Sequence, residues 1–266
     1  HREQSFIQER LPRMYERFSE LGVDMAEEAV EVAPTSHYGM GGVVVDENAE
    51  TDVDGLFAIG ETMAGVHGAN RLGGNSLAET VAYGVVAGEA VAERVDGPGH
   101  VPEAVLTSLA EPHLRGLQST AGVEGEYEPE TLLTELRDLM WEHAGILRDE
   151  ASLQAGLDEL DDIRRKAERL DVGGVTSRSF EFAIDLGFML TVSESVLRSA
   201  LERTESRGAH YRTDHTEVDS DLQCNICVER TDLGGMALST EPVDEPSEPV
   251  RAALDEGHEL DYHQLE

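Results

Sequence analysis

Four short clusters in the first third of the chain combine glycines with side chains that can bind a ligand. The glycines allow the backbone to approach a flat or charged ligand closely. The histidines, the arginine and the carboxylates supply hydrogen bonds and charge. In chain order the clusters are Pro34-Thr35-Ser36-His37-Tyr38-Gly39-Met40-Gly41-Gly42, Gly55-Leu56-Phe57-Ala58-Ile59-Gly60-Glu61, Val66-His67-Gly68-Ala69-Asn70-Arg71 and Leu72-Gly73-Gly74-Asn75-Ser76-Leu77-Ala78-Glu79.

Each cluster offers a different contact. Residues 73–76 open a helix, and the free N–H groups there can hold an anion or an electron-rich carbonyl. Glu61 follows an apolar run that we expect to be a strand, where a carboxylate suits a ribose hydroxyl. Arg71 can bind a carboxylate through two parallel hydrogen bonds, and His37 and His67 can donate to an anion.

Simpler interpretations exist for each residue alone. A loop arginine is more often part of a surface ion pair, and a single histidine is usually structural. Ser76 as a helix N-cap needs no function. The ordered succession of all four clusters favours a ligand site over these interpretations.

Negative charge is the strongest compositional feature. The chain has 55 Asp and Glu residues against 20 Lys and Arg, a formal net charge of −35. This field repels nucleic acid and anionic lipid, so we expect neither as a partner. A disordered acidic chain is one interpretation, but a hydrophobic content of 39% favours a folded protein. We interpret the charge as an adaptation to a high-salt cytoplasm, where salt screens self-repulsion.

The two cysteines, Cys224 and Cys227, form a single C-x-x-C. One such pair cannot complete a four-sulfur zinc or iron–sulfur site, so no metal site is expected. The surrounding alternation predicts a strand over 222–228, which points the two sulfurs to opposite faces.

Apolar spacing predicts mostly helices. We expect a first amphipathic helix over 4–21, a helix of small residues over about 75–93, and a break at 96–99. A bundle follows, with helices at 101–118, 128–146, 150–170 and 178–206, and a short helix lies near 247–255. In the last bundle helix the apolar series is Ile184, Phe188, Val192, Val196 and Ala200. The class is α+β or α/β with an all-α appendage.

The four clusters identify a family resemblance. The strings His37-Tyr38-Gly39-Met40-Gly41-Gly42 and His67-Gly68-Ala69-Asn70-Arg71-Leu72-Gly73-Gly74-Asn75-Ser76-Leu77 resemble the flavoprotein subunits of succinate dehydrogenase and fumarate reductase. The resemblance continues at Glu205-Ser206-Arg207-Gly208-Ala209-His210-Tyr211-Arg212-Thr213-Asp214. It covers most of residues 1–215.

The resemblance implies residue roles and a cofactor. His37 and Arg71 would bind a dicarboxylate, Glu61 would hold the FAD ribose, and Ser76 and Leu77 would contact the flavin ring through backbone N–H groups. It also implies the fold: the end of a capping domain (1–33), the C-terminal portion of a Rossmann-like FAD-binding domain (34–97), a helical bundle domain (98–206) and a C-terminal extension (207–266).

The resemblance further implies succinate–fumarate interconversion, with electrons passing to an iron–sulfur protein subunit. We expect a cytoplasmic protein that contacts the membrane only through partner subunits. No G-x-G-x-x-G occurs, and the family's covalent-flavin histidine and proton-donating arginine lie upstream, so no catalytic residue is assigned here. We therefore expect the chain to be inactive alone.

Within fumarate chemistry, a thiol-linked fumarate reductase of the kind found in some archaea stays open as well. Two alternatives of other function also stay open. L-aspartate oxidase shares the 67–71 string, although it usually continues as Met-Ala-Ser-Asn-Ser, where this chain has Leu72-Gly73-Gly74-Asn75-Ser76. The other alternative is a non-catalytic remnant or scaffold, which the missing pyrophosphate-binding motif would favour.

The net charge generates a prediction about salt. Raising KCl from about 0.1 M to about 1 M shortens the screening length from ~10 Å to ~3 Å. The midpoint of thermal unfolding, followed by circular dichroism, should therefore rise by at least about 2 °C, which corresponds to ~1 kcal/mol for a chain of this size. A midpoint that stays constant or falls across the series would contradict the high-salt interpretation.

Overall fold

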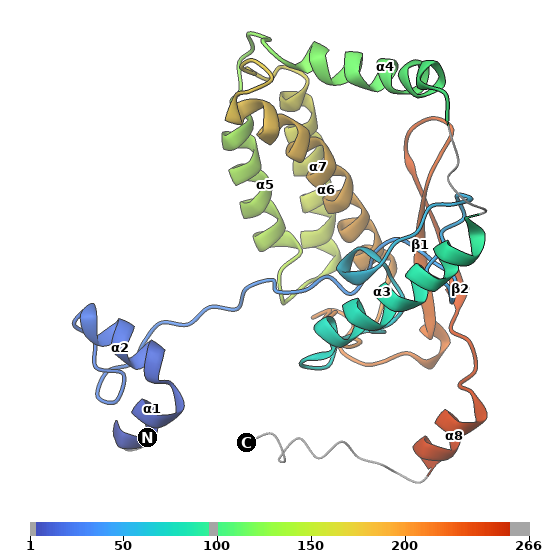
Figure 1. Ribbon diagram of the computed structural model, residues 1–266. Coiled ribbons are helices and arrows are strands. Elements are labelled where there is room, and N and C mark those ends of the chain that lie inside the picture. Colours follow the sequence, from blue (N-terminus) through green and yellow to red (C-terminus); the bar gives the residue numbers. More distant parts are fainter. Residues whose placement is uncertain (1–3, 96–100, 256–266) are drawn as a thin grey trace.

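The computed structural model of the protein describes residues 4–95 and 101–255. Two short helices, α1 (Gln4–Arg10) and α2 (Pro12–Glu20), project to one side and bury no residue (Figure 1). The single helix predicted over 4–21 is thus divided at Leu11. Pro12 explains the division, because proline cannot donate to the preceding turn but suits the first position of a new helix.

The remaining helices lie close to their predicted positions. They are α3 (Asn75–Arg94), α4 (Glu103–Thr120), α5 (Pro129–His143), α6 (Glu150–Ala167), α7 (Arg178–Glu202) and α8 (Glu248–Asp255). The predicted break at 96–99 lies outside the described residues. The predicted domain boundaries stay predictions. None of the described helices is both long and apolar enough to cross a bilayer.

Helices α5, α6 and α7 form a three-helix bundle with one hydrophobic core (Figure 1). The prediction that the helix at 101–118 belongs to this bundle was wrong, because α4 lies beside it and contributes no described residue to the core. Leucines recur at helical spacing on each inner face and are almost wholly excluded from solvent. Asp149 and Ser177 cap the N-termini of α6 and α7 by accepting hydrogen bonds from Ser152 N and Phe180 N. The core residues include Leu132, Leu136, Leu153, Leu160, Leu186 and Leu197.

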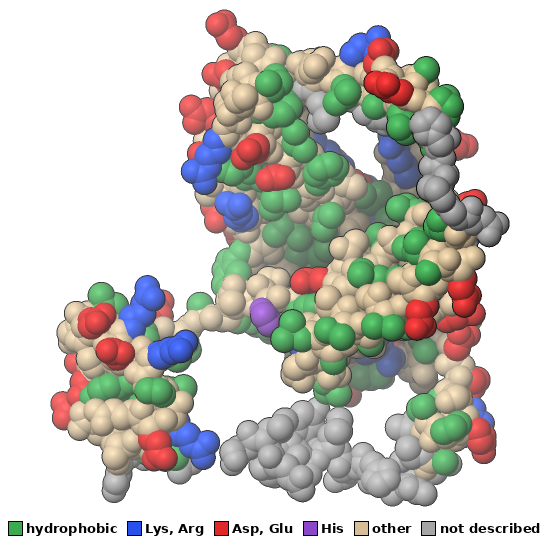
Figure 2. Space-filling view, in the orientation of Figure 1, with side chains coloured by type: hydrophobic (Ala, Val, Ile, Leu, Met, Phe, Trp, Pro, Cys, Tyr) green, Lys and Arg blue, Asp and Glu red, His purple; other side chains and the backbone are tan. Residues whose placement is uncertain are grey.

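The apolar series predicted for the core face of α7 was largely wrong. Phe188 and Val192 are 68% and 60% exposed, whereas Leu186, Leu190 and Leu197 are buried. Helix α7 is apolar around much of its circumference, so spacing alone allows two stripes, and packing against α5 and α6 selects one. Figure 2 shows hydrophobic side chains on the viewed surface over both the bundle and α3.

The C-terminal segment contains a β-hairpin. Strand β1 (Cys224–Arg230) confirms the predicted strand, and it pairs antiparallel with β2 (Met236–Pro242), which the sequence analysis missed. Cys224 and Cys227 are both free thiols on β1. Burial raises the pKa of Cys227, and Glu241 beside it raises that pKa further.

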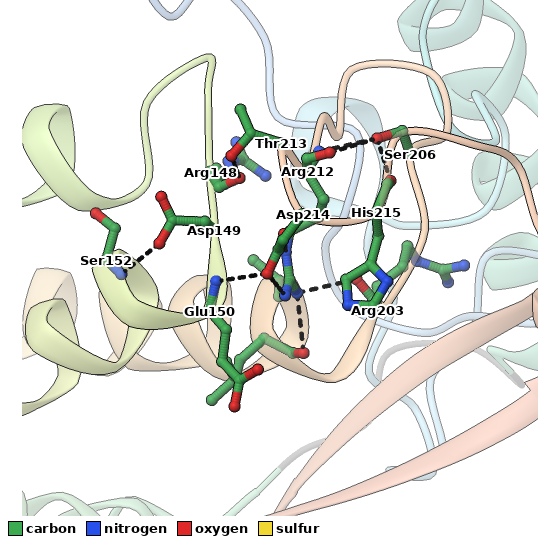
Figure 3. Close-up of polar contacts among 12 residues, drawn as sticks. Arg148, Asp149, Glu150, Ser152, Arg203, Ser206, Arg212, Thr213, Asp214 and His215 are labelled. Atoms are coloured by element: carbon green, nitrogen blue, oxygen red, sulfur yellow. Dashed lines mark hydrogen bonds and ion pairs between the residues drawn. The ribbon is translucent and has the colours of Figure 1, made fainter.

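A buried polar network joins the end of α7 to the start of α6 (Figure 3). The guanidinium of Arg212, 1% exposed, donates to both carboxylate oxygens of Asp214 at 2.7 Å and to the carbonyl of Ala200 at 3.0 Å. Asp214 in turn accepts from Glu150 N at 2.9 Å. Arg212 therefore satisfies a carbonyl at the C-terminus of α7, and Asp214 satisfies an amide at the N-terminus of α6.

A buried carboxylate lies beside this network. Glu205 is fully buried and accepts from Arg203 at 2.6 Å, from Arg207 at 2.7 and 2.9 Å, and from Asp219 N at 2.8 Å. Burial alone would raise its pKa, but these hydrogen bonds outweigh burial and lower the pKa from 4.5 to about 2.

This pKa shift predicts an acid-dependent loss of stability. Between pH 4.5 and about 2, Glu205 binds a proton more readily in the unfolded chain than in the folded chain. The stability that ionised Glu205 contributes is therefore fully present above pH 4.5 and is lost as the pH falls towards 2. Glu205→Gln should lower the free energy of unfolding by ~3 kcal/mol at neutral pH. The difference in free energy of unfolding between wild type and Glu205→Gln, measured by urea denaturation, should become smaller as the pH approaches 2.

Glu181→Gln is the matched control, because Glu181 is an exposed glutamate on α7. It should leave the free energy of unfolding within about 0.5 kcal/mol of wild type. If the difference in free energy of unfolding between wild type and Glu205→Gln stays constant from neutral pH to pH 3, the ion pairs of Glu205 do not stabilise the fold.

Candidate functional site

The first two sequence clusters lie side by side. Val43 N donates to Thr62 O at 2.8 Å, and Ala64 N donates to Val43 O at 2.9 Å. Gly42 lies so close to the neighbouring segment that a Cβ there would stand 2.8 Å from the carbonyl carbon of Met63. This contact fixes the His37 cluster against the Glu61 cluster.

Glu61 lies in a single 3-10 turn, Gly60–Thr62. The strand predicted directly before it was wrong, because 56–59 makes only an isolated bridge, between Phe57 and Glu50, and no continuous ladder forms there within the described chain. The exposed Glu61 carboxylate accepts from Gly39 N at 2.9 Å through Oε1. No described residue donates to its second oxygen.

Tyr38, His67 and Glu79 meet in a buried polar cluster. The Tyr38 hydroxyl lies 3.3 Å from Glu79 Oε2 and 3.1 Å from His67 Nε2. A phenol has one proton, so if the hydroxyl donates to the carboxylate, His67 Nε2 donates to the hydroxyl. The His67 and Glu79 side chains are only 7% and 3% exposed. Burial raises the pKa of Tyr38, and Glu79 raises it further.

Arg71 is held against this cluster. Its guanidinium lies over the Tyr38 ring, 4.7 Å from the centroid, and Nη1 donates to Leu72 O at 3.1 Å. Its Nε atom is buried and has no hydrogen-bond partner. A buried, unpaired N–H on a charged group is costly, so it indicates a missing acceptor.

Arg71 borders a shallow hollow of about 260 Å³. His37 also lines the hollow and is exposed to solvent. The two residues predicted to bind a dicarboxylate thus border one space. The other lining residues are Thr35, Ser36, Tyr38, Met40 and Asn70.

The N-terminus of α3 is open, as the sequence predicted. Gly74, with φ of 83°, occupies the N-cap position, and no side chain caps the first N–H groups. Ser76 lies inside the helix, so its interpretation as an N-cap was wrong. Leu77 in the first turn is 77% exposed. The residues predicted to contact a flavin therefore present a free helix terminus.

Tyr38 and Glu79 belong to this site, and the sequence analysis gave neither a role. Tyr38 follows His37 directly, and Glu79 lies one helical turn after Ser76. Glu79 therefore lies near the free N-terminus of α3. The sequence does not distinguish Glu79 from Glu89 and Glu93, which lie in the same helix and are exposed, so its burial was not predictable from sequence.

Family models match most of the chain. Residues 1–77 match the FAD binding domain, and residues 133–252 match the domain described as fumarate reductase flavoprotein C-term. The chain is 39% identical to a fumarate reductase flavoprotein subunit of Haemophilus influenzae over 82% of its own length. It is also 35% identical to an L-aspartate oxidase of Acinetobacter baylyi over 85% of its length.

The structure resembles that of Escherichia coli quinol fumarate reductase FrdA, with a TM-score of 0.83 and 34% identity. That match covers 93% of this chain and 44% of FrdA. The chain spans 37% of the Haemophilus protein and 40% of the Acinetobacter protein, so it corresponds to less than half of each relative. The predicted fold, the end of an FAD-binding domain followed by a helical domain, is confirmed.

The packing of Gly42 predicts the effect of a single methyl group. Gly42→Ala should push Met63 away from the His37 cluster and lower the free energy of unfolding by ~1–3 kcal/mol. Gly41→Ala is the control, because a Cβ at Gly41 meets nothing within 4 Å. Chemical denaturation of the two variants would measure the difference. Equal stability would show that the two clusters can separate without cost.

Proposed function

Because the chain belongs to the fumarate reductase and succinate dehydrogenase flavoprotein family and corresponds to its C-terminal part, we propose that it completes an FAD-dependent oxidoreductase. This enzyme interconverts succinate and fumarate. The observation that carries the proposal is the unpaired Nε of Arg71, in a guanidinium that borders the same hollow as His37.

Arg71 is prepared for a carboxylate. Its Nη1 is occupied by Leu72 O and its plane rests on Tyr38, so the guanidinium is fixed before any ligand arrives. Nε and the adjacent Nη2 form the side of the guanidinium that suits two parallel hydrogen bonds to one carboxylate. His37, across the hollow, suits the second carboxylate of a dicarboxylate.

The residues present also fit FAD. The uncapped N-terminus of α3 offers backbone N–H groups and a positive dipole end, which favour negative charge on the pyrimidine edge of a reduced flavin. Ser76 and Leu77 would provide these contacts. The free oxygen of Glu61 would accept from a ribose hydroxyl, while Gly39 N holds the other oxygen. When bound, FAD supplies the hydride acceptor and donor.

The protein side chains would orient the substrate. Arg71 would hold the dicarboxylate in a fixed orientation, and it would offset negative charge that grows on the substrate. The buried Tyr38–His67–Glu79 cluster supports Arg71 from behind. We propose that the proton-donating arginine belongs to the part of the family's flavoproteins that this chain does not span, so that this chain has no turnover alone.

Electron transfer completes the proposal. Electrons would pass to an iron–sulfur protein subunit, and contact with the membrane would be made by partner subunits only. Support comes from the likeness to FrdA of a quinol fumarate reductase. A cytoplasmic location and a high-salt environment are parts of the same proposal.

L-aspartate oxidase is the second candidate, because a relative of that name matches at 35% identity. The string Leu72-Gly73-Gly74-Asn75-Ser76 favours succinate and fumarate. The two candidates differ in whether the site accepts an α-amino group, so a substrate comparison separates them.

Arg71→Lys tests the proposal in the complete flavoprotein loaded with FAD. Lysine keeps the charge but loses the parallel pair of N–H donors. Loss of one partner of a desolvated charge pair costs ~2–5 kcal/mol, so kcat/KM for succinate with a dye acceptor should fall at least about 30-fold.

Arg178→Lys is the matched control. Arg178 also stacks on an aromatic ring, that of Phe182 at 5.1 Å, but it lies at the start of α7. It should change kcat/KM by less than about twofold. Unchanged activity in Arg71→Lys would overturn the role of Arg71. Oxidation of aspartate alone would support the second candidate, and failure to bind FAD would support a non-catalytic remnant.

A further inference from the structure

A tight turn in the C-terminal segment touches the loop that carries Arg71. Ala209 N donates to Ala69 O at 3.0 Å, although the two residues lie far apart in the sequence. This hydrogen bond is the backbone–backbone bond that joins loop 65–71 to another part of the described chain. The rest of the loop is held by side chains, those of His67 and Arg71.

The contact requires glycine at position 208. Gly208 has φ of +59°, and a Cβ built there would stand 2.5 Å from the carbonyl carbon of Ala69 and 2.7 Å from its Cβ. Such distances are far inside van der Waals contact, and the atoms met are mainly backbone. Any side chain at 208 would therefore displace Ala69 or the turn.

Backbone hydrogen bonds close the turn, and a side-chain ion pair holds its first residue, Arg207. Arg207 and His210 exchange backbone hydrogen bonds of 2.8 and 3.0 Å, which close the turn. The Arg207 guanidinium donates to both oxygens of the buried Glu205. The turn is thus anchored to the carboxylate that also accepts from Arg203.

The last residue of the turn is anchored to the bundle. His210 Nδ1 lies 2.9 Å from Arg148 Nη1, and Nε2 lies 3.2 Å from Arg203 O. Arginine only donates, so Nδ1 accepts and the proton is on Nε2. Burial lowers the pKa of His210, and the surrounding arginines lower it further, so the ring stays neutral as this geometry requires.

We propose that the 207–210 turn is a positioning element for Arg71, and that Gly208 is its point of contact. The turn transmits the position of the helical bundle to Ala69, two residues before Arg71. The inference rests on the proposed function only in assigning a dicarboxylate to Arg71. The contact itself is independent of the ligand.

The test compares Gly208→Ala with Gly234→Ala in the complete, FAD-loaded flavoprotein. Gly234 also has a positive φ, +85°, but a Cβ there meets nothing within 4 Å. Both variants therefore carry the backbone strain, and only Gly208→Ala carries the clash. Small misplacement of a binding group can cost ~100-fold, so we expect Gly208→Ala to lower kcat/KM for succinate about 10- to 100-fold.

The loss should come mainly from KM, because a carboxylate clamp acts on bound substrate as well as on the transition state. FAD content should match that of Gly234→Ala. Hydrogen exchange of the peptide covering 66–72 should be faster in Gly208→Ala only. Equal exchange and equal KM in the two variants would overturn the proposal.

Two further measurements keep the outcome decisive. If Gly208→Ala does not fold, His210→Ala removes the acceptor for Arg148 without placing an atom against Ala69, and it should change KM and exchange in the same direction by a smaller amount. An unchanged 66–72 exchange rate in His210→Ala would then overturn the proposal. If the wild type does not act on succinate, the proposed function fails, while the exchange comparison still decides whether the turn positions the loop.

Discussion

The burial of two charged side chains, Arg212 and Glu205, is the constraint on which the rest of the structure depends. Charges this far from solvent are tolerated only when they are paired and hydrogen-bonded, and Asp214 pairs with Arg212 while Arg203 and Arg207 pair with Glu205. Arg212 donates to the end of α7, and its partner Asp214 accepts from the start of α6 (Figure 3). Glu205 accepts from Asp219 N in the segment before the hairpin. These three segments therefore cannot move independently without exposing an unpaired charge.

The candidate site inherits this rigidity although it contains little regular structure. Its residues lie on loops and at one helix terminus, and isolated bridges replace a sheet. Such loops need support from outside, which Gly42 provides against Met63 and the buried Tyr38–His67–Glu79 cluster provides beneath Arg71. A flavin and a dicarboxylate both require fixed donors, so this support has a direct chemical purpose.

Acidic residues far outnumber basic ones in this chain, so it is informative which carboxylates have a Lys or Arg partner. With 20 Lys and Arg residues for 55 acids, most carboxylates have no cation to pair with. Yet Glu205 receives two arginines, and the buried Glu194 receives Arg164 and Arg198. Burial raises the pKa of Glu194, but the hydrogen bonds from both arginines lower it overall. Two buried carboxylates thus receive two arginines each, while other cations, such as Arg165 beside Asp162, pair with carboxylates at the surface.

The sequence by itself determined the helices, the strand that carries Cys224, the open terminus before Ser76 and the residues that resemble a dicarboxylate and FAD site. These features depend on near neighbours, through spacing, glycine placement and proline breaks. The tertiary structure alone decided which stripe of α7 is buried, that Leu56–Ile59 lacks a ladder, and that β2 pairs with β1. It also decided that Glu79 reaches Tyr38 and that Gly208 meets Ala69. Those contacts join segments distant in the chain, and their geometry follows from packing and loop paths that local periodicity does not specify.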